Sequence, residues 1–503
     1  MKGKAAFINR IFPKKQAGIP GRVALAGLLS VGMLLVCSKN SPLYPMNDWV
    51  DVNCFFTVGR GMVHGLTPYL DLVDQKGPLL YALYALAARI SETSFLGVFL
   101  VEAACFAAFL YFSGRIAETV SGTPWAFGLT AAGLAVGIPL SPAFSHGGSA
   151  EELFLPVFAL SLYLVLRGVR KGETLKAGPV MILGACAAAA LWTKYTFCGL
   201  YAGLALAVVI RDIADFRGRN LLRMAGQALL GAALLSAAVL IRYAAAGALP
   251  ALWQSYFVDN LTRYTQNIRS GNYAQPLPNL LNNLTWSVPA AGGLLFLAGS
   301  AKKRWRELLA CLAGAVGLFV FTYASGRRYP YYAIVMACFG SLGFGALFAL
   351  LPGDWKGRKA FRRTAAALAA AGIALGPAAG LAWSGNVYLM GTEKESMPQY
   401  RFAETIREAG DSSLLNVGFL DGGFYFAAGS LPETRYFCTL NNDLPEMRQE
   451  MNEAVAEGKT EFVVTRGQKL KGGGYTLVDR AEMVFEGRKW TYFLWQKTGN
   501  QGK

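Results

Sequence analysis

Residues 178–210, GPVMILGACAAAALWTKYTFCGLYAGLALAVVI, contain a single charged side chain, Lys194. The stretch consists of two apolar runs joined by a tight turn at this lysine, and each run approaches the roughly 20 residues that span a bilayer. Basic clusters flank the pair at 167–176 and 211–223. Since short basic loops remain in the cytoplasm, the pattern predicts two membrane helices whose turn lies outside.

The same alternation of apolar runs and short polar loops extends over residues 21–383. The chain has 503 residues, 54% apolar and only 16% charged, whereas a soluble protein carries about a quarter charged residues. We therefore expect a mainly α-helical polytopic membrane protein with about 11 or 12 transmembrane helices in domain 1–383. The candidate spanning runs, followed by one shorter run, are 23–38, 94–112, 124–142, 150–166, 178–194, 196–210, 224–245, 286–300, 307–325, 331–351, 364–383 and 78–90.

The net charge of +17 comes from short basic clusters that each adjoin an apolar run. Binding to nucleic acid would instead need a basic face on a folded domain, so we exclude a nucleic-acid partner. Membrane lipids are the expected surroundings of a multi-pass plasma-membrane protein. The first run, 23–37, has no small-x-small cleavage site after it, which favours an uncleaved first helix.

The short run at 78–90 complicates the topology. If the N-terminus and the 167–176 loop are both cytoplasmic, an even number of crossings separates them, yet five apolar runs lie between them. A run of 13 residues is too short to span a bilayer easily, so 78–90 either enters and returns or lies obliquely. The remaining loops place 38–77, 246–285 and everything after Ser384 outside.

After Ser384 the composition becomes that of a soluble protein. We expect a small extracytoplasmic α/β domain over 384–503, with an accessory role. Of the eight cysteines, only Cys54 and Cys438 are placed to meet an oxidant outside, and no metal-type spacing or disulfide framework is present. The expected helices and then strands of this domain are 399–409, 444–456, 413–419, 461–465, 475–478 and 490–496.

The first outer loop carries three short motifs: Asn47-Asp48-Trp49-Val50-Asp51, Gly65-Leu66-Thr67-Pro68-Tyr69 and Asp74-Gln75-Lys76-Gly77-Pro78. Between the first two, residues 50–64 form an amphipathic stretch suited to lying at the membrane interface. An acidic residue just outside a membrane helix is often merely solvated.

Together these motifs resemble the first outer loop of the C-type glycosyltransferases (GT-C), in the family 39 branch of protein O-mannosyltransferases and lipid A aminoarabinose transferase. The resemblance implies inverting transfer of a sugar from a polyprenyl-phosphate donor to an extracytoplasmic acceptor: a cell-envelope glycan, lipid or protein. It implies that Asp48 is the base that deprotonates the acceptor. Lys76 would stabilise the charge that develops on the leaving phosphate.

A second outer turn, His146-Gly147-Gly148-Ser149-Ala150-Glu151-Glu152, precedes the run at 150–166. By the resemblance, Glu151 or Glu152 supplies a second catalytic carboxylate, with Glu151 preferred. Ser149 and Glu152 also have the spacing of an ordinary capping box, so that one glutamate caps the helix while the other acts. A divalent metal site of Asp48, His146 and Glu151 is left open, and no cofactor is assigned.

Further cations and tyrosines at outer boundaries suit a phosphate and lipid site. Arginine side chains match phosphate oxygens, and a lysine is costly in hydrocarbon unless it faces a polar cavity. The expected donor-phosphate ligands are Lys76, Lys194, Arg327, Arg328 and Tyr331, and the expected acceptor or donor contacts are Tyr69, Tyr256 and Arg263. The alternatives without a ligand site are that the arginines anchor the protein to lipid headgroups and that the aromatic residues form an interfacial belt.

A transporter or flippase of lipid-linked glycans is the principal alternative function. Such a protein should show inverted repeats or polar residues at mid-membrane. The sequence has no convincing internal repeat, and its unusual charged and aromatic residues lie at the outer boundary. This placement favours the enzyme. A catalytically inactive scaffold that displays its C-terminal domain stays open as a third hypothesis.

Overall fold

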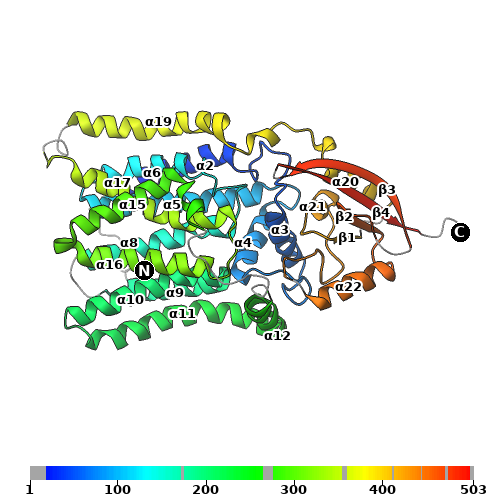
Figure 1. Ribbon diagram of the computed structural model, residues 1–503, viewed down its shortest axis with the longest axis horizontal. Helices are drawn as coiled ribbons and strands as arrows, with labels where there is room; N and C mark the ends of the chain where they lie inside the picture. Colours follow the sequence, from blue (N-terminus) through cyan, green and yellow to red (C-terminus); the bar gives the residue numbers. More distant parts are fainter. Residues whose placement is uncertain are drawn as a thin grey trace, which may run out of the picture.

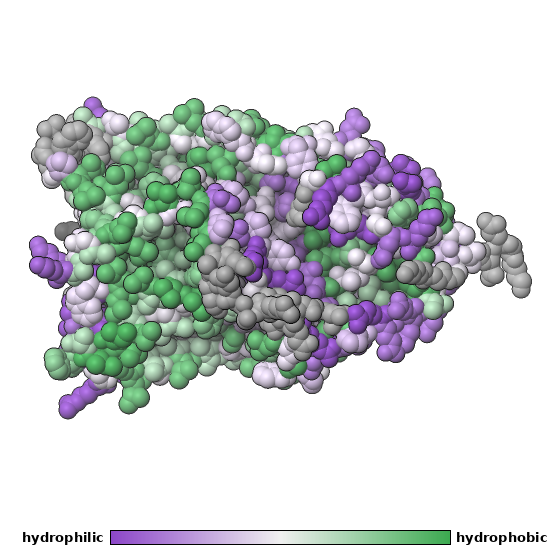
Figure 2. Space-filling view, in the orientation of Figure 1, coloured by the Kyte–Doolittle hydropathy of each residue, from purple (hydrophilic) through white to green (hydrophobic). Residues whose placement is uncertain are grey.

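A computed structural model shows a bundle of helices lying side by side, with a β-sheet region at one end (Figure 1). It describes residues 18–170, 175–263, 276–353, 359–410, 413–442, 444–470, 474–485 and 487–498. Apolar side chains cover the bundle, and polar side chains gather over the sheet region and at the opposite end (Figure 2). An apolar surface suits a membrane-embedded bundle, because the hydrocarbon offers no hydrogen-bond partner to polar groups.

Eight helical segments of the described chain are long and apolar enough to cross a membrane, and four shorter apolar helices accompany them. Together they match the predicted runs. The long segments are α2 (Ile19–Cys37), α5 (Leu96–Ser121), α7 (Ala150–Leu153) with α8 (Leu155–Arg170), Tyr195–Phe197 with α10 (Cys198–Ala214), α11 (Arg219–Ala245), α16 (Ala301–Tyr323), Pro330–Phe339 with α17 (Gly340–Leu350), and α19 (Lys359–Trp383). The short helices are α4 (Pro78–Ile90), α6 (Ala126–Gly137), α9 (Ala177–Thr193) and α15 (Leu284–Gly299).

The pairing of α2 with α5 explains the short run at 78–90. Arg22 forms an ion pair with Glu118 at 2.5 Å near one end of these helices, and Ser38 donates to Glu102 at 2.7 Å near the other. The two helices are therefore antiparallel, and α5 starts at the end of the bundle where α2 stops. Both ends of the 38–95 segment lie at that end, which we call the sheet end (Figure 1). Helix α4 therefore adds no crossing between α2 and α5, which removes the conflict in the predicted topology.

The amphipathic stretch forms helix α3 (Val50–Val63), but protein covers it on both faces. Gly59 packs directly on the α4 backbone at Tyr84. On the other side, Thr57 donates to Asp421 of the C-terminal region at 2.6 Å. The polar face of this helix therefore contacts the C-terminal region instead of water, and its position at the membrane interface stays a prediction.

The C-terminal region forms the predicted helices and strands. Its mixed sheet has the order β1-β2-β4-β3, with β1 and β2 parallel and the other neighbours antiparallel. The elements are α20 (Pro398–Glu408), β1 (Leu414–Val417), α21 (Phe424–Ala428), α22 (Pro445–Ala456), β2 (Phe462–Arg466), β3 (Tyr475–Phe485) and β4 (Arg488–Lys497). The domain boundary between residues 383 and 384 stays a prediction.

Candidate active site

Lys76 is held by a backbone strap at residues 74–77. The Tyr69 hydroxyl donates to the Lys76 carbonyl at 2.5 Å, and the Lys76 amide donates to the Tyr81 hydroxyl at 2.8 Å. The Asn260 amide donates to the Gln75 carbonyl, also at 2.8 Å. Hydrogen bonds to the backbone on both sides fix the point from which the Lys76 side chain extends. Tyr69 and Asn260 therefore act as positioning residues for Lys76.

The strap lies directly against the end of α9. The Gly77 amide donates to the Thr193 carbonyl at 2.9 Å. A Cβ atom at Gly77 would lie 2.1 Å from the Trp192 carbonyl oxygen, so only glycine permits this approach. Lys194 follows immediately, with the extended backbone that ends α9. The close contact thus places Lys76 beside Lys194, which comes from a different part of the chain.

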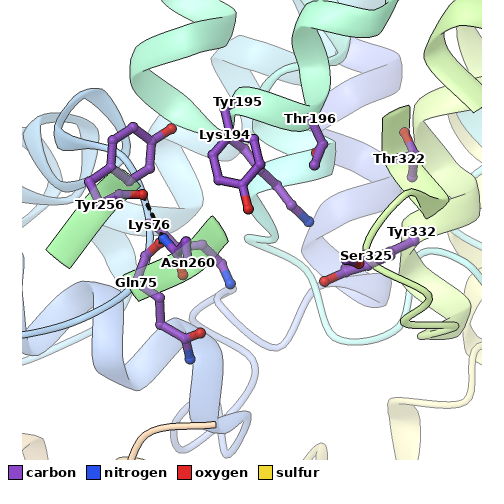
Figure 3. A pocket seen from close by; sticks show the side chains of 10 residues that line it. All are labelled: Gln75, Lys76, Lys194, Tyr195, Thr196, Tyr256, Asn260, Thr322, Ser325 and Tyr332. Carbon is purple, nitrogen blue, oxygen red and sulfur yellow. Dashed lines mark hydrogen bonds between the residues drawn. The ribbon is translucent and has the colours of Figure 1, made fainter. Parts of the chain in front are cut away.

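Both lysines line one pocket at the sheet end, and their ammonium groups point into it (Figure 3). The Lys194 ammonium also lies 3.7 Å from the centre of the Tyr332 ring and forms an ion pair with Glu151. Two ammonium groups facing one space favour an anionic ligand. The pocket is lined by Gln75, Lys76, Lys194, Tyr195, Thr196, Tyr256, Asn260, Thr322, Ser325 and Tyr332.

The two adjacent glutamates have separate tasks. Glu151 is buried against Lys194. Glu152 accepts a hydrogen bond from the Gly148 amide at 2.8 Å, and its own amide donates to the Ser149 hydroxyl at 3.0 Å. Ser149 is therefore a true helix cap, and Glu152 supports the turn before it. Of the pair, only Glu151 reaches a pocket residue.

Asp48 is buried, and both of its oxygens are engaged. Its Oδ1 accepts from the Lys39 ammonium at 2.7 Å, and its Oδ2 accepts from the Tyr388 hydroxyl at 3.2 Å. Lys39 and Tyr388 line a second cavity of about 650 Å³ together with His146. Asp48 thus belongs to the surroundings of this second cavity, and its predicted role as base is untested.

Asp51 is the acidic residue that the sequence interpretation passed over. It lies in the first turn of α3, is half-buried, and accepts a hydrogen bond from the Tyr331 hydroxyl at 3.1 Å. It is also close enough to act electrostatically on Lys194. The available signal was the helix start at Val50, since a carboxylate in a first helical turn is favoured by the helix dipole.

The remaining predicted contacts divide between the pocket and the surface. Tyr256 lines the pocket and donates to the Leu191 carbonyl at 2.5 Å. Arg263 instead forms an ion pair at 2.7 Å with Glu446 of α22, outside the pocket. Arg328 is exposed, and Arg327 is partly buried. Neither arginine is among the residues that line the lysine pocket.

The suggested metal ligands are not brought together. Asp48 is bonded to Lys39, whereas Glu151 is bonded to Lys194. Within the described ranges, no group of three or more His, Cys, Asp and Glu side chains is arranged to hold a metal ion. A carboxylate already paired with a buried ammonium is a poor ligand, so the residues do not fit the metal site considered from sequence.

No protein-family model matches the chain, and no curated protein matches it in sequence. Among solved structures, it resembles ArnT from Cupriavidus metallidurans bound to undecaprenyl phosphate, with a TM-score of 0.59 and 16% identity over 95% of this chain and 98% of that one. The likeness to the apo form of the same protein has a TM-score of 0.58 and 15% identity, over 93% of this chain and 97% of that one. The Archaeoglobus fulgidus oligosaccharyltransferase, solved with zinc and sulfate, has a TM-score of 0.48 and 14% identity, over 88% of this chain and 67% of that one. The likeness to ArnT confirms the fold that the sequence resemblance predicted: this chain has an ArnT-like fold.

Proposed function

We propose that the chain is a membrane glycosyltransferase that moves a sugar from a polyprenyl-phosphate donor to an acceptor outside the plasma membrane. The observation that carries this proposal is the convergence of Lys76 and Lys194 on one pocket at the end of an apolar helical bundle. A lipid phosphate combines a long apolar chain with an anionic head. The protein offers an apolar bundle surface to the chain and a pocket with two ammonium groups to the head. The ArnT structure bound to undecaprenyl phosphate supports a ligand of this class.

The two lysines serve the leaving group. Attack of the acceptor on the anomeric carbon breaks the bond between that carbon and the phosphate oxygen, and negative charge develops on the departing phosphate. Fixed cations in a partly buried pocket stabilise that charge more strongly than water does. Glu151 holds the Lys194 ammonium in place through their ion pair. It thereby acts as a positioning residue.

Asp51 is the carboxylate best placed to act as base. A base must take the proton from the acceptor hydroxyl or amine as it attacks. Asp51 is half-buried, bonded to Tyr331 and near Lys194, while Asp48 is enclosed by Lys39 and Tyr388. A single displacement assisted by one base inverts the anomeric carbon. The base assigned to Asp48 from sequence is thus reassigned to Asp51 in this proposal.

The pocket and the C-terminal region are proposed to lie on the extracytoplasmic side. Support comes from the basic loops at the end of the bundle opposite the sheet end, where Arg306 binds Asp215 at 2.5 Å. Cytoplasmic loops are the ones enriched in lysine and arginine. An outward-facing pocket would meet a donor in the outer leaflet and an acceptor in the cell envelope.

Transfer is tested by incubating the purified protein with a panel of radiolabelled polyprenyl-phosphate sugars and membrane extracts. One label should move to a new acceptor, and Lys76→Ala and Lys194→Ala should each lower turnover about 100-fold. Lys302→Ala, a change of the same kind at an exposed residue at the opposite end, should leave turnover unchanged. Labelled donor that crosses a reconstituted bilayer but stays covalently intact would instead identify a flippase.

A further inference from the structure

Two cysteines from distant parts of the chain meet beside the candidate site. Cys54 of α3 and Cys438 of the C-terminal region have their Sγ atoms 3.8 Å apart, although 384 positions separate them in sequence. Both are 1% exposed. The other six cysteines belong to helices of the apolar bundle: Cys37, Cys105, Cys186, Cys198, Cys311 and Cys338. The pair is therefore set apart by its position at the sheet end.

The surroundings of the pair form a continuous interface between α3 and the C-terminal region. The Asp421 amide donates to the Cys54 sulfur at 3.4 Å, and Thr57 donates to the Asp421 carboxylate. One turn further along α3, Arg60 donates to the Tyr425 carbonyl at 3.3 Å. These bonds fix the two backbones on either side of the sulfur atoms. The thiols consequently face each other in a defined geometry.

We propose that Cys54 and Cys438 form a disulfide in the mature protein, joining α3 covalently to the C-terminal region. This inference rests on the extracytoplasmic placement proposed above, because disulfides persist outside the cytoplasm and are reduced within it. The two Sγ atoms, 3.8 Å apart, would have to close to the bonding distance of about 2.05 Å.

The bond forms by thiol–disulfide exchange with an oxidised dithiol protein of the cell envelope. One cysteine, as thiolate, attacks a sulfur of the oxidant and gives a mixed disulfide. The second then attacks the first, so that one S–S bond forms within the chain. The oxidant leaves with two thiols, having accepted the two electrons, and the two thiol protons are conserved. Nothing else is consumed.

Exchange must precede the packing of α3 on the C-terminal region. In the folded protein both sulfurs are enclosed, and burial raises the pKa of the Cys54 thiol well above its usual value. A buried neutral thiol is a poor nucleophile. The same enclosure protects the finished disulfide from reductants in the native state.

The cross-link bears on the candidate active site through Asp51. Cys54 follows Asp51 by three residues, which is one helical turn. Fixing Cys54 to the C-terminal region therefore limits the rotation and sliding of the turn that carries Asp51. Through this bond, the C-terminal region would hold the α3 turn that carries Asp51 in a fixed position relative to the lysine pocket.

Counting thiols in the denatured wild-type chain tests the disulfide directly. Cells are precipitated with acid, and all free thiols, including the buried ones, are alkylated with a small reagent in denaturant; the purified protein is then reduced and labelled with a heavy maleimide. Two of the eight cysteines should carry the heavy label, and digestion without reduction should yield one peptide pair linking Cys54 to Cys438. Eight lightly alkylated cysteines would overturn the proposal.

Single variants identify the pair without depending on correct folding. Cys54→Ser and Cys438→Ser should each abolish heavy labelling, whereas Cys186→Ser, a buried cysteine of α9, should still give two heavy labels. Heavy labelling that survives in both Cys54→Ser and Cys438→Ser would place the bond elsewhere and contradict the assignment.

A topology measurement distinguishes an absent disulfide from a wrong assignment of the C-terminal region to the extracytoplasmic side. Glu395 is exposed in the C-terminal region, so Glu395→Cys should react with a membrane-impermeant maleimide on intact spheroplasts. Reaction there, together with free Cys54 and Cys438, would overturn the disulfide alone. No reaction until the membrane is opened would overturn the extracytoplasmic placement as well.

Discussion

Asp48 and Asp51 stand three residues apart, yet their surroundings differ completely. Asp48 forms a buried ion pair with Lys39, whose ammonium also binds Tyr388. Asp51 is half-buried and reaches the tyrosine next to the lysine pocket. A buried ion pair mainly fixes structure, whereas a half-buried carboxylate is available to exchange protons.

Substituting each aspartate separates these roles. Asp51→Asn should lower turnover by about 100-fold or more, because the acceptor loses its base, while donor binding and thermal stability are retained. Asp48→Asn should lower stability by about 3–5 kcal/mol, because the buried Lys39 loses its counter-charge. Turnover, donor affinity and the melting temperature are measured for both.

The double variant Lys39→Met with Asp48→Asn is the control, since removing both charges should recover much of the melting temperature. A fully stable but inactive Asp48→Asn, paired with an active Asp51→Asn, would return the catalytic role to Asp48.

Among the structural elements, the strap at residues 74–77 contributes Gln75 and Lys76 to the lysine pocket. Its carbonyls and amides are bonded to Tyr69, Tyr81 and Asn260, and its glycine touches the last carbonyls of α9. Since the pocket joins a loop with the end of a helix, its width depends on how closely these two backbones approach.

Gly77→Ala should therefore widen the pocket. The added Cβ would meet the Trp192 carbonyl oxygen at 2.1 Å, so that the strap must shift, at a cost of about 1–3 kcal/mol in stability. We expect a raised donor concentration requirement and reduced turnover, measured with the labelled donor. Gly178→Ala, where a Cβ meets no atom within 4 Å, is the matched control and should leave activity unchanged. Equal activity of the two variants would contradict the close-approach argument.

At the scale of the whole molecule, α3 lies between the helical bundle and the C-terminal region. It packs on α4 at Gly59 and contacts the C-terminal region through Thr57 and Arg60. Asp421, on the other side of that interface, is completely enclosed. The ionisation of Asp421 is consequently coupled to the packing of α3 on the C-terminal region.

This coupling predicts a pH dependence. Burial raises the pKa of Asp421 from 3.8 to about 6, although hydrogen bonds from Thr57 and Gly423 oppose the shift. The folded chain therefore holds this proton more tightly than the unfolded chain. The contribution to stability is fully present below about pH 4 and is lost as the pH rises to about 6, by about 3 kcal/mol.

Asp421→Asn isolates this contribution, because asparagine still accepts hydrogen bonds but does not titrate in this range. Between pH 4 and 6 the melting temperature of the wild type should fall relative to that of the variant, and above pH 6 the difference should be constant. Parallel melting curves across pH 4–6 would contradict the prediction.

The helices and strands could be predicted from the order of the residues alone. Apolar runs of sufficient length dictate membrane helices, and local patterns give the cap at Ser149 and the strands and helices after Ser384, because these depend on neighbours within a few positions. Which side chains share the pocket could not be predicted in this way, because it depends on the packing of distant segments. Asp48 is engaged by Tyr388, and Lys194 is brought beside Lys76, through contacts between distant segments. Such contacts depend on how helices pack, and a three-residue difference along the chain separates Asp48 in a buried ion pair from half-buried Asp51, which is bonded to Tyr331.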